Sequence, residues 1–156
     1  MIWNENMECM DREQLREIQS KKKKKIVDYV YHNTPFYRKK FQEMDINPAD
    51  IRDIDDISKL PFTNKLDLRD NYPFGLAAVP MSQIVRIHAS SGTTGKPVVV
   101  LYTRKDLATW AESISRAFTA YGADKTDIFQ ISYGYGLFTG GLGAHDGATN
   151  IGASVI

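Results

Sequence analysis

The chain has 156 residues, of which 42% are hydrophobic and 25% are charged, and this composition is typical of a globular domain with a core of ordinary size. The formal net charge of +1 gives no global electrostatic case for binding nucleic acid or a membrane. A single cysteine, Cys9, excludes an internal disulfide and cannot bind a metal alone. No apolar run approaches the roughly 18 residues of a membrane-spanning helix, and no signal peptide is recognisable, so we expect a cytoplasmic protein.

Helical signals dominate the first half of the chain. After an arm that we expect to be extended over residues 1–10, Asp11 predicts the N-cap of a helix that runs to about Tyr31. Thr34, followed directly by a proline, predicts the N-cap of a second helix. We therefore expect residues 1–75 to form a helical N-terminal lobe.

Five consecutive lysines, Lys21–Lys25, interrupt the apolar face of the first predicted helix. Such a run can mark a surface that binds an acidic partner, which would make the chain an interaction protein. The net charge is near zero and no aromatic residue is interleaved with the lysines. A solvated helix whose lysine stems lie along apolar surface is the simpler interpretation.

Small hydroxyl residues, two glycines and a lysine are concentrated in one short stretch before Pro97. Glycines let backbone N–H groups converge on one point, the hydroxyls add donors, and the lysine adds positive charge. The stretch therefore predicts a binding site for a polyphosphate, with a plain flexible hairpin loop as the alternative. Its predicted phosphate-binding residues are Ser90, Ser91, Gly92, Thr93, Thr94, Gly95 and Lys96.

The runs on either side of this loop, residues 84–89 and 98–102, are rich in β-branched residues and predict two paired strands. A Walker A loop would instead place glycine at position 90 and a hydroxyl residue at position 97, before a helix. Ser90 and Pro97 occupy those positions. The sequence therefore predicts a phosphate loop carried on a β-hairpin, not a P-loop.

Alternating helix and strand signals follow the hairpin. Thr103 predicts the N-cap of an amphipathic helix that ends at Gly122. Residues 128–133 then predict a strand, a glycine-rich turn follows, and residues 137–151 predict a helix before a terminal strand. This order is a β-α-β unit with parallel strands. The predicted fold class is α/β, with residues 76–156 forming an incomplete α/β part.

Aromatic residues and glycines meet where the predicted strand at 128–133 ends. Ligands of open α/β sheets bind at the carboxyl ends of strands, so Tyr135, Gly136 and Phe138 are candidate ligand contacts, with His145 as a further candidate. A turn filled by aromatic side chains and a buried, satisfied histidine are the alternatives. The three histidines share no ligand spacing, so no metal site is expected.

The loop sequence Ser-Ser-Gly-Thr-Thr-Gly-Lys-Pro at residues 90–97 resembles the phosphate-binding motif of the adenylate-forming enzymes, which include acyl-CoA synthetases and luciferases. In many of those enzymes the lysine follows the proline, whereas Lys96 precedes Pro97 here. This order resembles the phenylacetate–CoA ligase branch, and the similarity extends from about Met10 to Ile156. The other stretches that carry it are residues 60–63, 65–69, 71–75 and 133–141.

The resemblance implies an ATP-dependent ligase that joins phenylacetate or a related aryl acid to coenzyme A through an acyl-adenylate, releasing AMP and diphosphate. ATP with Mg²⁺ would lie against the loop, and the aryl group near Tyr135 and Phe138. Lys65, at the start of a short helix predicted by Asn64, would reach the nucleotide; an ordinary surface lysine is the alternative. Aryl acid, ATP and CoA are the expected partners, and a homodimer is left open.

Enzymes of this family are considerably longer and carry a second, mobile domain. The last residues, 153–156, resemble the beginning of a buried strand. We therefore expect an N-terminal fragment that lacks the C-terminal part, contains no catalytic residue and is inactive in ligation by itself. A non-catalytic nucleotide- or phosphate-binding module is the alternative.

Overall fold

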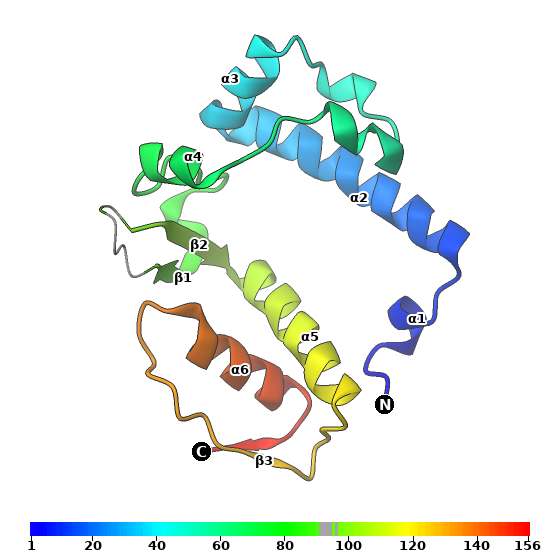
Figure 1. Cartoon of the computed structure of the whole chain (residues 1–156), viewed down its shortest axis with the longest axis vertical. Helices are drawn as coiled ribbons and strands as arrows, with labels where there is room; N and C mark the ends of the chain where they lie inside the picture. The colour runs from blue at the N-terminus through cyan, green and yellow to red at the C-terminus, as the bar shows by residue number, and fades with distance from the viewer. Residues whose placement is uncertain (91–94, 96) are drawn as a thin grey trace. The chain divides into compact units, whose positions relative to one another are not determined.

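The computed structural model describes residues 1–90, 95 and 97–156 and divides the chain into two compact units (Figure 1). One unit, here called the helical unit, spans Met10–Met81. The other, here called the hairpin unit, joins Met1–Cys9 to Ser82–Ile156. The boundary expected between residues 75 and 76 stays a prediction for the domains of the whole protein.

Capping residues set the beginnings of the helices in the helical unit. The side chain of Asp11 accepts hydrogen bonds from the first turn of α2, as predicted. Thr34 occupies the N-cap position of α3, and Pro35 begins the helix, as predicted, but the Thr34 side chain makes no cap hydrogen bond. Val27, Phe41 and Ile51 form the buried core. The elements are α2 (Arg12–Asn33), α3 (Pro35–Glu43), η1 (Pro48–Asp50), η2 (Ile54–Lys59) and α4 (Lys65–Asp70).

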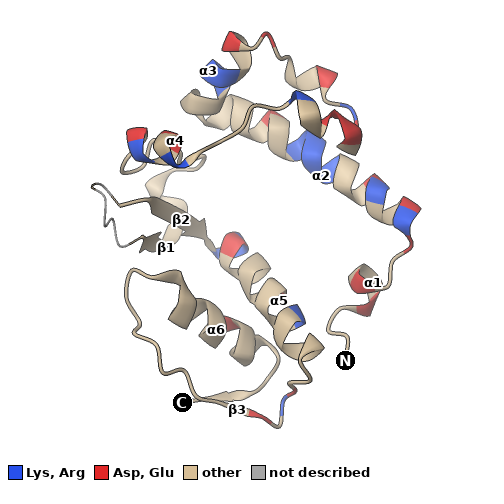
Figure 2. Cartoon of the chain, in the orientation of Figure 1, with Lys and Arg blue, Asp and Glu red and all other residues tan. Residues whose placement is uncertain are grey.

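The lysine run on α2 is not a uniformly solvated face. Lys23 is only 7% exposed, and its Nζ has no hydrogen-bond partner among the described residues. Lys21 forms an ion pair with Glu17 at 2.6 Å. Figure 2 shows charges of both signs along α2. The expectation of a solvated run is therefore wrong for Lys23, because this position lies four residues before Val27 on the buried face.

A hairpin and a β-α-β unit make up most of the hairpin unit, in agreement with the predicted α/β class. Strands β1 and β2 pair antiparallel, and β3 and β4 pair parallel with α6 between them. The bounds are α1 (Glu5–Glu8), η3 (Met81–Gln83, at the junction of the units), β1 (Ile84–Ala89), β2 (Val99–Thr103), α5 (Arg104–Ala120), β3 (Ile128–Phe129), α6 (Thr139–Asn150) and β4 (Ser154–Val155).

Two details of this unit differ from the expectation. The arm is not extended throughout, because Asn4 caps the short helix α1 and accepts a hydrogen bond from the backbone N–H of Met7. The strand expected at 128–133 is short, because β3 pairs only with the brief β4. Pairing ends where the N–H of Ile131 donates to the carbonyl of Ile156.

Helices α5 and α6 lie side by side (Figure 1), and glycines on α6 make this approach close. A Cβ at Gly143 would lie 2.6 Å from the Trp110 ring, and one at Gly147 would lie 2.2 Å from Ile114. The buried hydroxyl of Ser115 on α5 donates to the Gly147 carbonyl at 3.1 Å. Glycine is therefore required at both positions by contact with α5.

Candidate functional site

The base of the predicted phosphate loop is closed by hydrogen bonds. Ala89 pairs with Val99 at the end of the hairpin, and the backbone N–H of Ser90 then donates to the Val98 carbonyl at 2.9 Å. The Ser90 hydroxyl accepts from the Val98 N–H at 3.0 Å. A hydroxyl that accepts one bond can still donate its own hydrogen to a ligand.

Gly95 has φ of +122°, a backbone conformation that side chains with a Cβ rarely adopt. The other predicted phosphate-binding residues lie outside the described part of the chain, so their contacts with a phosphate stay predictions. They are Ser91, Gly92, Thr93, Thr94 and Lys96.

One carbonyl joins the strand before the loop to the aromatic–glycine segment, residues 133–138. The carbonyl oxygen of Leu137 accepts the backbone N–H of Ala89 at 2.8 Å and also contacts the Nδ1 of His88 at 3.0 Å. A carbonyl cannot donate, so Nδ1 of this histidine carries the proton. The end of β1, at His88 and Ala89, and the predicted acid-binding segment are thus neighbours within the hairpin unit.

His88 lies in an aromatic cluster at this junction. Its ring is 1% exposed and meets the rings of Tyr102 and Trp110 edge-on, each at a centroid distance of 5.5 Å. Tyr102 and Trp110 stack at 5.1 Å. Burial, with the charge of Asp106, raises the pKa of Tyr102. The sequence reasoning gave His88 no role, although a histidine in an apolar strand two residues before the loop was a usable signal.

The aromatic side chains of residues 133–138 are presented largely to solvent. Tyr135 is 54% exposed and Phe138 is 47% exposed. The Tyr135 hydroxyl and the Nδ1 of His145 lie 3.0 Å apart, with their rings edge-on at 5.8 Å. A Cβ at Gly136 would meet nothing within 4 Å. The structure thus pairs Tyr135 with His145, and their predicted contact with an acid stays a prediction.

Helix α6 begins directly after Phe138, which makes no side-chain cap hydrogen bond. The first N–H groups of a helix lack partners inside the helix and favour a negative charge. A Cβ at Gly140 would lie 3.3 Å from the Tyr133 ring, so that ring packs against Gly140 in the first turn. This end of α6 therefore combines backbone donors with exposed aromatic surface.

Lys65 is the first residue of α4, in the helical unit. Asn64 and Asp67 form the predicted capping box at this helix start. The Nζ of Lys40 donates to the Asp67 carboxylate at 2.8 Å and to the Phe62 carbonyl at 2.7 Å, and the bond from Lys40 is the largest cause of a lowered pKa at Asp67. These bonds fix α4, while a contact of Lys65 with nucleotide stays a prediction.

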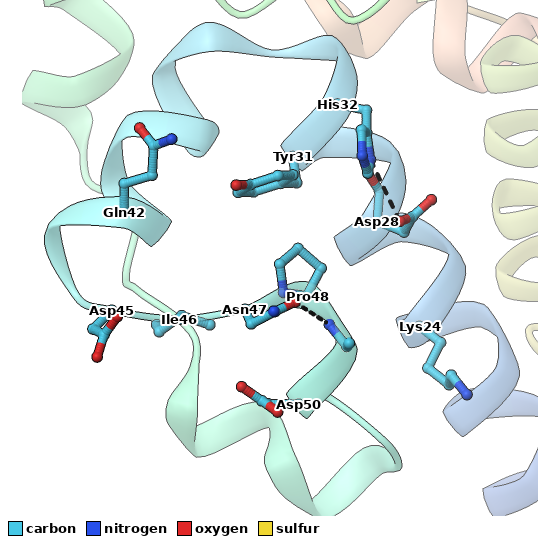
Figure 3. Close-up of a pocket in the computed structure, with 11 residues that line it drawn as sticks. Lys24, Asp28, Tyr31, His32, Gln42, Asp45, Ile46, Asn47, Pro48 and Asp50 are labelled. Carbon is cyan, nitrogen blue, oxygen red and sulfur yellow. Dashed lines mark hydrogen bonds and ion pairs between the residues drawn. The ribbon is translucent and has the colours of Figure 1, made fainter.

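An open pocket of about 720 Å³ lies elsewhere, within the helical unit (Figure 3). Three carboxylates line it, those of Asp28, Asp45 and Asp50. His32 faces Asp28, with 3.4 Å between Nδ1 and the carboxylate. Carboxylates repel phosphate oxygens, so this pocket does not suit ATP. Among the described residues, no group of three or more His, Cys, Asp or Glu could hold a metal ion.

Curated relatives share about half of the residues of this chain. It is 48% identical over 156 residues to the phenylacetate–coenzyme A ligase of Thermus thermophilus, an alignment that covers 100% of this chain and 35% of that protein. It is 48% identical over 159 residues to the Escherichia coli enzyme of the same name, covering 100% and 36%. It is 50% identical over 152 residues to the Aromatoleum evansii enzyme of that name, an alignment that covers 97% of this chain and 34% of that protein.

Solved structures of an acyl-CoA ligase share the fold. A 2-hydroxyisobutyryl-CoA ligase with 2-HIB-AMP and CoA in the thioesterification state matches with a TM-score of 0.89 and 27% identity, over 97% of this chain and 33% of that one. The open conformation of the same ligase matches with a TM-score of 0.88 and 25% identity, and this match covers 97% of this chain and 36% of that one.

No protein-family model matches the chain, and none of the helices in the described residues is long and apolar enough to cross a membrane. The chain spans about a third of the length of the relatives that it matches. The hairpin and the adjoining β-α-β unit occur in a chain that is similar over its whole length to phenylacetate–CoA ligases. The chain shares the fold of an adenylate-forming CoA ligase.

Proposed function

We propose that the complete protein containing this chain is an ATP-dependent aryl-CoA ligase that acts on phenylacetate or a related aryl acid. The observation that carries the proposal is the Leu137 carbonyl, which accepts bonds from both His88 and Ala89. It holds an exposed aromatic segment beside the strand that leads into the phosphate loop. An acid bound at that segment would lie next to the phosphates of ATP.

The reaction consists of two displacements. A carboxylate oxygen of the acid attacks the α-phosphorus of ATP, forming an acyl-adenylate and releasing diphosphate. The thiolate of CoA then attacks the acyl carbon, forming the thioester and releasing AMP. The solved structures of 2-hydroxyisobutyryl-CoA ligase are complexes with 2-HIB-AMP and CoA, which supports an acyl-adenylate and CoA as ligands here.

The loop would stabilise the charge that moves onto the departing diphosphate. The hydroxyls and backbone N–H groups of residues 90–95 would donate to it, and Lys96 would supply positive charge. Mg²⁺ bound to the ATP phosphates would neutralise further charge. The uncapped first turn of α6 after Phe138 would favour the carboxylate of the acid before it reacts.

Aryl preference follows from the surface that surrounds this turn. Tyr135 and Phe138 are exposed aromatic side chains, and the Cβ position of Gly136 has nothing within 4 Å. An aromatic ring stacks on such faces with a preference of about 0.5–1.5 kcal/mol beyond its buried area. The 2-hydroxyisobutyrate of the solved relatives has no ring to make these contacts.

Acid-dependent exchange of labelled diphosphate into ATP tests the proposal in the complete protein. We expect exchange with phenylacetate and much less with 2-hydroxyisobutyrate, followed by thioester formation when CoA is added. Phe138→Ala should raise the KM for phenylacetate about tenfold, because it removes one aromatic face. The KM for ATP should not change. An absence of exchange with every aryl acid, or a preference for the aliphatic acid, would contradict the proposal.

A non-catalytic nucleotide-binding module is the second candidate, favoured by the Ser90 hydroxyl, which accepts from the Val98 N–H and can still donate its own hydrogen to a phosphate. The same assay separates the two functions. Such a module would bind ATP in a calorimeter and catalyse no exchange with any acid. The 156-residue chain by itself is expected to behave in this way.

A further inference from the structure

His88 is a buried polar side chain between the two halves of the proposed active site. Its ring is 1% exposed, and its backbone lies in β1, two residues before Ser90. Burying a polar ring is costly unless it forms hydrogen bonds. The ring makes one, from Nδ1–H to the Leu137 carbonyl at 3.0 Å.

The other ring nitrogen has no partner among the described residues, since Nε2 is buried and makes no hydrogen bond. The ring is therefore buried although only one of its two nitrogens makes a hydrogen bond among the described residues. Leu and Phe would fill similar space without this cost, but neither can donate to Leu137. What distinguishes histidine at this position is the donated bond.

The surroundings of the ring leave it little freedom. Tyr102 of β2 and Trp110 of α5 both pack edge-on against it, at 5.5 Å. Trp110 in turn lies where a Cβ at Gly143 of α6 would be only 2.6 Å away. The donor is thus held by a packed cluster to which β1, β2 and α5 contribute. The acceptor of its hydrogen bond, the Leu137 carbonyl, belongs to residues 133–138, which precede α6.

We propose that His88 is a positioning residue that sets the placement of the acid-binding segment relative to the phosphate loop. It acts through the Leu137 carbonyl and touches neither substrate. The inference rests on the proposed function, because it assigns His88 to the alignment of the acid with the α-phosphate of ATP. Small misplacements of reacting groups cost about a hundredfold in rate, so a fixed separation matters for the first displacement.

Two amide variants provide the central test. The amide nitrogen of Asn lies close to the position of Nδ1, whereas that of Gln lies close to Nε2. His88→Asn therefore keeps the donor to Leu137, and His88→Gln moves it away at nearly the same polarity. His88→Leu removes the donor altogether. Tyr102→Phe keeps the stacked ring and is the packing control.

The measurement is the coupling between the two substrates in the complete protein. The Kd of phenylacetate is determined with and without a non-hydrolysable α,β-methylene analogue of ATP. The wild type is expected to bind the acid about tenfold more tightly with the analogue. His88→Gln and His88→Leu should lose most of this factor and about a hundredfold in kcat. His88→Asn and Tyr102→Phe should keep the coupling.

Several outcomes would overturn the inference. Equal coupling in the Asn and Gln variants would show that the donor position is irrelevant, and this comparison remains decisive if His88→Leu fails to fold. A wild type that releases diphosphate but shows no coupling would also overturn it. A wild type that neither binds the substrates nor releases diphosphate contradicts the proposed function itself, and the inference then falls with it.

Hydrogen exchange gives a readout independent of activity. The Ala89 amide donates to the same Leu137 carbonyl at 2.8 Å. Its exchange should become at least about tenfold faster in His88→Gln than in His88→Asn if the bond from His88 holds this segment in place. Unchanged exchange in both variants would contradict the positioning role.

Discussion

At the scale of single residues, Lys23 is a cationic side chain in a buried environment that provides no hydrogen-bond partner among the described residues. A buried polar group that stays unsatisfied costs about 1–3 kcal/mol, and more when it is charged. The neighbouring lysines on α2 are exposed. A run of five identical residues on a helix must point in different directions, so its members do not share one environment.

Replacing Lys23 by methionine should stabilise the protein. Met fills nearly the same volume without an amine to desolvate, so the free energy of unfolding should rise by about 1 kcal/mol or more. Urea denaturation would measure the change. Lys22→Met, at an exposed neighbour, is the matched control and should change stability by less than about 0.5 kcal/mol. A destabilised Lys23→Met variant would show that the amine has a favourable interaction.

At the scale of elements, the hairpin could be predicted from sequence because β-branched runs flank a loop rich in glycine. The register runs unbroken from Ala89↔Val99 to Arg86↔Tyr102 and shifts before Ile84↔Thr103. The N-cap of α5 could also be predicted from the sequence, because Thr103 and Asp106 have the spacing of a capping box and form one. The packing role of the α6 glycines could not be predicted from the sequence. Gly143 and Gly147 are required by the approach of α5, and no local pattern specifies which helix will lie there.

Gly147→Ala tests this packing. An added Cβ would lie 2.2 Å from Ile114 Cγ2, so one helix must shift, at a cost of about 1–3 kcal/mol. The higher helix propensity of alanine recovers at most about 1 kcal/mol. We therefore expect net destabilisation in urea denaturation.

The double variant Gly147→Ala/Ile114→Gly provides the control for this clash. Cγ2 and Cβ of Ile114 would lie 2.2 and 2.5 Å from the new methyl group, and glycine removes both. The double variant should therefore be less destabilised than the sum of the single variants. Strict additivity of the two substitutions would show that the helices do not clash at this point.

At the scale of the whole molecule, the first residues of the chain return to the hairpin unit and bind α5. The indole N–H of Trp3 donates to Glu112 at 2.6 Å, and the amide of Asn4 donates to the same carboxylate at 2.8 Å. Arg116 pairs with Glu112 at 2.8 Å. The bond from Asn4, then those from Trp3 and Arg116, lower the pKa of Glu112, against an opposing effect of burial.

The stabilisation from Glu112 should depend on pH. Because its pKa in the folded state is lowered from the ordinary 4.5, the contribution is present above that value and is lost as the pH falls through the folded-state pKa. Glu112→Gln should therefore lower Tm at neutral pH and flatten the fall in Tm between about pH 5 and pH 3. Thermal unfolding across this range is the measurement. Glu5→Gln, at an exposed carboxylate in the same arm, should keep the wild-type slope, and an unchanged slope in Glu112→Gln would contradict the assignment.

The sequence by itself determined the caps of α2 and α5, the hairpin, the β-α-β order and the resemblance to phenylacetate–CoA ligases. These features depend on local chemistry: a side chain that caps its own first turn, a glycine that permits a turn, and a motif whose residue order is specific. The loop at residues 90–97 already identified the adenylate-forming enzymes, and the relatives confirm that assignment.

Only the tertiary structure decided which distant groups meet. The Leu137 carbonyl reaches His88, Trp3 reaches Glu112, and Gly147 lies against Ile114, across separations of 33 or more residues along the chain. Such contacts depend on how whole helices and strands pack, because side-chain burial and hydrogen bonding are satisfied collectively and not within a sequence window. The proposed role of His88 follows from such contacts. The sequence shows a histidine in an apolar strand two residues before the loop, but not the groups that it meets.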